Sequence, residues 1–72
     1  MRQTPRGLFG QRIMSLRLKR GLSQEEFAAK AGYSRSYVSL VENGHYAASL
    51  DAIVTFANVL EVKPAELLRG IS

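Results

Sequence analysis

The segment 35–43 concentrates side chains that are able to contact the hydrogen-bonding edges of another molecule. Arginine can donate two parallel hydrogen bonds, a geometry that matches O6 and N7 of guanine. Serine contacts either a base or a phosphate, and an apolar side chain packs against the methyl group of thymine. Arg35, Ser36 and Leu40 are therefore candidate base-contacting residues. The alternative is that this segment is only the solvated face of a short helix.

A second group of residues is suited to contacts with phosphate and sugar. Such contacts position a protein on DNA but do not distinguish between base sequences. Gln24 follows a predicted helix cap, where unpaired backbone amides and the helix dipole favour an anion. The full set of candidate backbone-contacting residues is Arg20, Gln24, Ser34, Tyr37, Ser39, Asn43 and Tyr46.

Two short capped helices are expected to carry these residues. Ser23 and Glu26 have the spacing of a capping box, and Gly32 is suited to end the helix that they begin. Ser34 caps the next helix, which Gly44 ends. A turn this short forces a steep crossing, which predicts a helix-turn-helix at about 23–43. The apolar residues at helical spacing are Phe27, Ala28, Ala31, Val38 and Val41.

The rest of the chain also has helical periodicity, so the predicted fold class is all-α with five helices. The core is expected to include Phe9, Ile13 and Leu16 and, from the fourth helix, Leu50, Ile53, Phe56, Ala57 and Leu60. The domain is predicted to span 7–70, followed by a tail at 71–72. The expected helices are about 7–20, 24–31, 35–43, 50–60 and 64–69.

Residues 1–6 are expected to form a flexible N-terminal arm, although Thr4 and Pro5 have the pattern of a helix cap and first turn. Arg2 and Arg6 either contact DNA, at a backbone phosphate or in the minor groove, or are simply solvated. Gly7 and Gly10 each cost about 1 kcal/mol in a helix interior, so the first turns of this helix are expected to fray.

The charge is unevenly distributed. The first forty of the 72 residues have a net charge of +6 and the rest −2, which gives the overall +4. A basic patch adds salt-dependent affinity for nucleic acid, although it also serves as a solubilising surface. The length indicates one domain. The chain lacks cysteine, a signal sequence and a membrane-spanning apolar run, which predicts a cytoplasmic, nucleoid-associated protein without membrane contact.

No pattern of residues suggests catalysis. The sequence has no thiol, no second histidine to accompany His45 and no glycine-rich phosphate loop. The acidic residues lie mostly near predicted helix ends, where capping and dipole effects account for them. We therefore expect neither an enzyme nor a metal or other cofactor.

Several co-linear segments resemble the Cro/C1-type, phage-repressor-like helix-turn-helix family. They are GQRI at 10–13, LR at 16–17, RGLSQEEFA at 20–28, GYSR at 32–35, Val38, ENG at 42–44 and ANVLEV at 57–62. The resemblance implies a compact five-helix bundle that places its third helix in the major groove of double-stranded DNA. It also implies a transcription regulator, of repressor or restriction-modification-controller type, that contacts RNA polymerase or a cognate partner protein.

The resemblance further implies two structural roles. Arg17 is expected to form a partly buried ion pair with Glu42, and Gln24 to contact the DNA backbone and brace the third helix. The C-terminal helices are expected to form a homodimer that binds a palindromic operator. The apolar residues in excess of a small core, assigned to this interface, are Val54, Val59, Leu68 and Ile71.

The chain departs from the family pattern at two places. Leu40 replaces a residue that is often polar, and loop 44–48 lacks the family's frequent basic residue or proline. The departure at Leu40 leaves the number of base-contacting side chains open. A second function is also open, because the same fold serves as a protein-interaction or antitoxin-like module. Arg35 and the basic first half favour DNA over that alternative.

Overall fold

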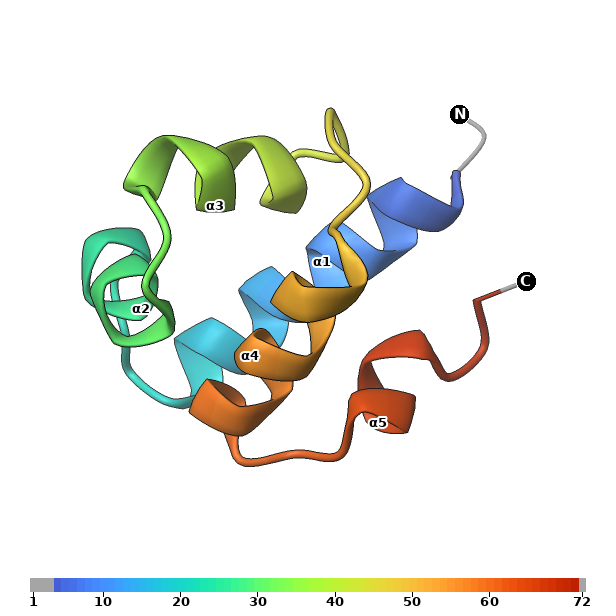
Figure 1. The fold of residues 1–72 in the computed structure, drawn as a ribbon. Helices are drawn as coiled ribbons and strands as arrows, with labels where there is room; N and C mark the ends of the chain where they lie inside the picture. Colours follow the sequence, from blue (N-terminus) through green and yellow to red (C-terminus); the bar gives the residue numbers. More distant parts are fainter. Residues whose placement is uncertain (1–3, 72) are drawn as a thin grey trace.

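Five helices form the described part of the computed structural model, residues 4–71, as the sequence predicted (Figure 1). Their main pairwise contacts are α1 with α3, α4 and α5, α2 with α3 and α4, and α4 with α5. In Figure 1, α3 lies along the upper edge, and the link between α4 and α5 lies at the bottom. The helices are α1 (Pro5–Lys19), α2 (Gln24–Ala31), α3 (Arg35–Glu42), α4 (Leu50–Leu60) and α5 (Pro64–Leu68).

Helix α1 begins earlier than its predicted start at residue 7. The Thr4 side chain accepts a hydrogen bond from the Gly7 amide at 3.0 Å, and Pro5 occupies the first turn. Pro5 and Arg6 are therefore helical, and the prediction of a flexible arm is wrong for these two residues. Residues 1–3 of that predicted arm, which include Arg2, lie outside the described residues.

The predicted bounds of α2 and α4 are confirmed, and the other three helices each end one residue early. In each case the last predicted residue is the cap that follows the helix. These caps are Arg20, Asn43 and Arg69. The predicted tail also differs, because Ile71 is half-buried and packs against the core.

The core is a single cluster of twelve buried hydrophobic residues drawn from all five helices. Its largest fully buried side chains are Phe27, Phe56, Ile13, Leu60, Leu67, Val38 and Val41. The prediction that Leu50 closes the core is wrong, because its side chain is 75% exposed. Ala52, Phe56 and Leu60 form the inward row at four-residue spacing, and Leu50, at the first position of α4, lies outside it.

Gly10 has a packing role that its low helix propensity does not suggest. It is buried within a continuous helix, and a Cβ atom there would lie 2.3 Å from the Val41 carbonyl oxygen and 2.6 Å from that of Glu42. Only glycine allows the α1 backbone to approach the end of α3 this closely. The residue that weakens α1 as a helix therefore sets its distance from α3.

Candidate nucleic-acid interface

Helices α2 and α3 form the predicted helix-turn-helix because each begins at a serine cap. The Ser23 hydroxyl accepts from the Glu26 amide at 3.0 Å, and the Glu26 carboxylate accepts from the Ser23 amide at 2.9 Å. This second bond holds the pKa of the Glu26 carboxyl below its ordinary value. Gly32 ends α2 in the left-handed conformation, and Ser34 starts α3 two residues later by accepting from the Tyr37 amide at 3.1 Å.

Helix α3 has one buried face and one face toward solvent. Val38, Val41 and Glu42 are buried, whereas Arg35 and Ser36 in the first turn are exposed. Leu40 is half-buried, and its carbonyl accepts hydrogen bonds from the next loop. The structure thus leaves two of the three candidate base-contacting side chains free and the third partly accessible.

A buried ion pair locks the far end of α3. The predicted Arg17–Glu42 pair is present and bidentate, with Nε to Oε2 at 2.6 Å and Nη2 to Oε1 at 3.0 Å. The Arg17 and Glu42 side chains are only 8% and 0% exposed, respectively. The third nitrogen of Arg17, Nη1, donates to the Leu22 carbonyl at 2.8 Å. One charge pair therefore fixes α1, the start of the α2 segment and α3 relative to one another.

Gln24 joins this network, which is the bracing role that the family resemblance implied. Its Nε2 donates to Oε1 of Glu42 at 3.0 Å. The Glu42 carboxylate thus accepts three hydrogen bonds from two side chains. Asn43 donates from Nδ2 to the Ser39 hydroxyl at 3.4 Å, so this second polar pair lies together at the end of α3. Contact between any of these groups and phosphate stays a prediction.

An aromatic group joins α3 to α4, and sequence reasoning missed it. The rings of Tyr33 and Tyr37 stack with centroids 4.9 Å apart, and both lie against Phe56. The Tyr37 hydroxyl accepts from the Ser49 amide at 3.3 Å. Tyr37 is therefore half-buried between two helices, and only its hydroxyl hydrogen is free to donate elsewhere. Tyr46 flanks the group and is 51% exposed.

Arg20 is not placed beside the exposed turn of α3. Its Nη1 lies 3.7 Å from the Glu61 carboxylate at the end of α4. In Figure 1 the ends of α1 and α4 lie on the lower side of the molecule, opposite α3. Of the candidate backbone-contacting residues, Arg20 is thus the one that the structure separates from the others.

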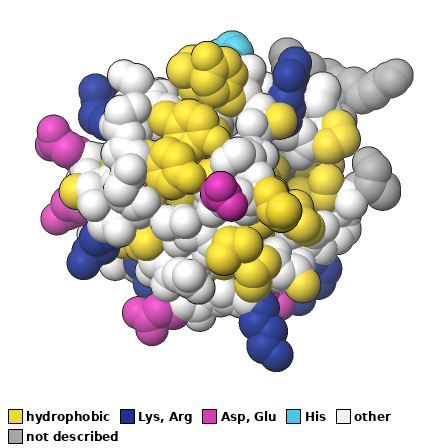
Figure 2. Space-filling model, in the orientation of Figure 1, with side chains coloured by type: hydrophobic (Ala, Val, Ile, Leu, Met, Phe, Trp, Pro, Cys, Tyr) yellow, Lys and Arg dark blue, Asp and Glu magenta, His cyan; other side chains and the backbone are white. Residues whose placement is uncertain are grey.

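The four predicted dimer residues divide into two pairs. Val54 and Leu68 are 44% and 43% exposed, whereas Val59 and Ile71 are half-buried against the core. Figure 2 shows hydrophobic side chains gathered around α4 on this face. The exposed pair, together with Leu50, leaves an apolar surface that α4 and α5 share.

The described part of the chain has no helix long and apolar enough to cross a membrane. Within residues 4–71, acidic, histidine and cysteine side chains form no cluster able to hold a metal ion. His45 is exposed in the loop after α3.

Residues 13–67 match the family model described as Helix-turn-helix. The chain is 40% identical over 62 residues to the control protein C.BamHI from Bacillus amyloliquefaciens, covering 85% of this chain and 76% of that protein. The restriction-modification controller protein C.AhdI from Aeromonas hydrophila has a similar structure, with a TM-score of 0.84 and 45% identity. That match covers 86% of this chain and 94% of C.AhdI.

A third similar protein is SinR, a master regulator for biofilm formation that has been solved in complex with DNA. It matches with a TM-score of 0.80 and 36% identity, over 83% of this chain and 97% of the SinR chain. A complex of SinR with the protein SinI also matches, with a TM-score of 0.83 and 35% identity, over 86% of this chain and 61% of that one.

Proposed function

Because the chain belongs to the Cro/C1-type helix-turn-helix family of DNA-binding transcriptional regulators, we propose that it binds a palindromic operator as a homodimer. The family consists of regulators and not of enzymes. We propose a role like that of a restriction-modification controller or a repressor, because the chain is similar to proteins of both kinds. Its place of action is the cytoplasm, at the nucleoid.

One observation supports this proposal most directly. The last turn of α3 is held by a buried ion pair, whereas its first turn is exposed to solvent. The buried Glu42 side chain holds the last turn, while Arg35 and Ser36 extend from the first. Because α3 is already held in position, its backbone loses little conformational freedom when these side chains bind. We assign base contacts to Arg35, Ser36 and Leu40. The proposed backbone contacts come from Gln24, Ser34, Tyr37, Ser39, Asn43 and Tyr46.

The Arg35→Ala variant tests the assignment of base contacts. Arg35 is exposed, so the thermal midpoint should stay close to that of the original protein. Discrimination at the contacted base pair should fall by about 1–3 kcal/mol. The measurement is a binding titration against the preferred duplex and single-base variants of it.

Lys63→Ala is the matched control, because Lys63 is also an exposed cation but lies at the start of α5, away from α3. Its pattern of base preference should be unchanged. Unaltered preference in the Arg35→Ala variant would contradict the assigned role of Arg35.

The homodimer is proposed from the apolar surface of α4 and α5. Val54 and Leu68 are nearly half exposed there, although each is large and apolar. A two-fold contact through this surface would place two copies of α3 on one side of a DNA duplex. In such dimers the recognition helices enter successive major grooves about 34 Å apart. Palindromic half-sites follow from that symmetry.

Val54→Glu should convert the dimer to a monomer, because the carboxylate would lose water within the apolar contact. Sedimentation velocity measures the change in mass, and operator affinity should fall with it. Leu18→Glu is a control at another exposed apolar residue, 61% exposed on α1. Dissociation by both variants, or by neither, would contradict the proposed surface.

A partner protein is a second candidate, supported by the similar SinR–SinI complex. RNA polymerase or a cognate partner would then act on the DNA-bound dimer. A module that binds protein alone, such as an antitoxin-like domain, remains the rival class. Such a module should tolerate Arg35→Ala in its partner binding, whereas an operator-binding protein loses base preference.

A further inference from the structure

The first turn of α1 is fixed against the end of α3. A Cβ atom on Gly44 would lie 3.0 Å from the Gly7 Cα and 3.9 Å from the Arg6 carbonyl carbon. Three residues further along α1, Gly10 meets the last carbonyl groups of α3. The Thr4 cap and Pro5 hold the same turn in helical form. Arg6 is therefore placed next to the loop that follows α3, by backbone contacts on both sides.

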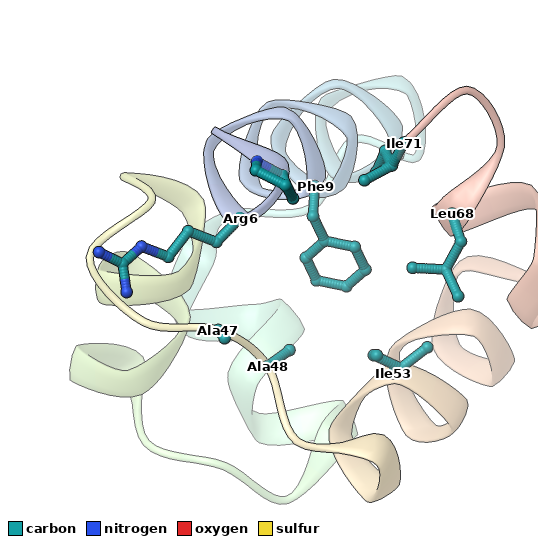
Figure 3. A pocket seen from close by; sticks show the side chains of 8 residues that line it. Arg6, Phe9, Ala47, Ala48, Ile53, Leu68 and Ile71 are labelled. Carbon is teal, nitrogen blue, oxygen red and sulfur yellow. The ribbon is translucent and has the colours of Figure 1, made fainter. Parts of the chain in front are cut away.

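The Arg6 side chain is directed away from the interior. Arg6 lies at the rim of a small apolar cavity of about 160 Å³. Phe9, Ile53 and Leu68 are among the residues that line this cavity. In Figure 3 these apolar side chains surround the cavity, whereas the Arg6 guanidinium extends away from it beside the segment that joins α3 to α4. Arg6 is exposed, and within residues 4–71 it has no ion pair or side-chain hydrogen bond. No described residue takes up any of its five guanidinium donors.

The loop itself supplies no cation at this end of α3. Residues 44–48 contain neither lysine nor arginine, and the final residues of α3 are Val41 and the paired Glu42. Near this end, Arg6 is the charge that the fold adds from a distant part of the chain. A guanidinium is well suited to a phosphate, since its planar fork donates two hydrogen bonds to the phosphate oxygens.

We propose that Arg6 binds a DNA backbone phosphate that flanks the major groove beside the end of α3 and the following loop. This assignment rests on the proposed DNA-binding function and extends the contact surface to α1. Arg35 contacts bases from the first turn of α3, whereas Arg6 binds the DNA backbone beside the last turn of α3.

The experiment compares the salt dependence of operator binding for Arg6→Ala and the original protein. Each lost phosphate contact should reduce the slope of log K against log salt by about 0.9 for duplex DNA. A rise in salt from about 50 to 200 mM should therefore weaken operator binding by Arg6→Ala about threefold less than it weakens binding by the original protein. Base preference should be unchanged, which separates this role from that of Arg35. Arg6→Lys retains the charge and should keep the original slope.

Lys63→Ala is the matched control and should leave the slope unchanged, because the start of α5 lies opposite α3. Thermal unfolding of Arg6→Ala should match that of the original protein, as expected for an exposed side chain. An Arg6→Ala slope equal to the original would overturn the inference about Arg6 alone. Failure of the original protein to prefer any duplex would instead overturn the proposed function.

Discussion

Replacing Glu42 with alanine should lower the free energy of unfolding by about 3–5 kcal/mol, because it leaves the buried Arg17 charge without its partner. The Glu42 carboxylate accepts all three side-chain hydrogen bonds that join Arg17 and Gln24 to α3. Neither charged side chain is accessible enough for water to replace these bonds, with Arg17 only 8% exposed. Urea denaturation monitored by circular dichroism measures the change.

Two further variants separate the cost of an unpaired buried charge from the cost of losing an exposed ion pair or of losing both buried charges. Arg69→Ala breaks the exposed pair with Glu66 and should cost at most about 1 kcal/mol. The double variant Arg17→Met with Glu42→Leu removes both charges and should be less damaging than Glu42→Ala. A Glu42→Ala protein as stable as Arg69→Ala would show that the pair does not hold α3 in place.

Gly10→Ala should destabilise the protein by about 1–3 kcal/mol, although alanine favours a helix more than glycine does. The new methyl group would meet the carbonyl oxygen of Val41 at 2.3 Å and that of Glu42 at 2.6 Å. Both contacts are with backbone, so no flexible side chain can move aside. The thermal midpoint should fall, and operator affinity should fall with it because α3 must shift relative to α1.

The neighbouring exposed residue provides the control for Gly10. Gln11→Ala alters the same turn of α1 without reaching α3, so its stability should change by less than about 0.5 kcal/mol. Stabilisation by Gly10→Ala would mean that helix propensity dominates and that α1 does not approach α3 as closely as described.

Local sequence signals were sufficient to predict the fold class and the helix pair. Serine caps at Ser23, Ser34 and Ser49 mark three helix starts, because a hydroxyl at the cap satisfies an amide that the helix leaves free. The Arg17–Glu42 pair was expected only because the sequence resembles a known family. Twenty-five positions separate the two residues, and no local pattern indicates that they meet.

Features that depend on tertiary packing were not predictable in this way. Gly10 weakens a helix by propensity, and only the position of α3 shows why glycine is required there. Leu50 was expected in the core from the apolar pattern of α4, yet its side chain is 75% exposed. Glu61 ends α4 in the left-handed conformation with φ of 59°, where a sequence argument expects glycine.

In the candidate site, too, some features follow from local sequence and others depend on tertiary packing. The exposed first turn of α3, with Arg35 and Ser36, follows directly from the helix periodicity of the sequence. The sequence did not indicate that the Tyr37 ring packs on Tyr33 or that its hydroxyl accepts from the Ser49 amide at the start of α4. Contact of Tyr37 with phosphate stays a prediction. Arg6 was assigned to a flexible arm, and only the folded chain brings it beside the end of α3.

The most direct test of the DNA-binding account is selection of bound duplexes from a random pool at about 150 mM salt, where nonspecific phosphate binding is weakened. The account predicts an inverted repeat whose half-sites are about one helical turn apart. It also predicts loss of preference at one position of each half-site when Arg35→Ala replaces the original protein. Recovery of no shared motif, with binding that only fades as salt rises, would contradict the account.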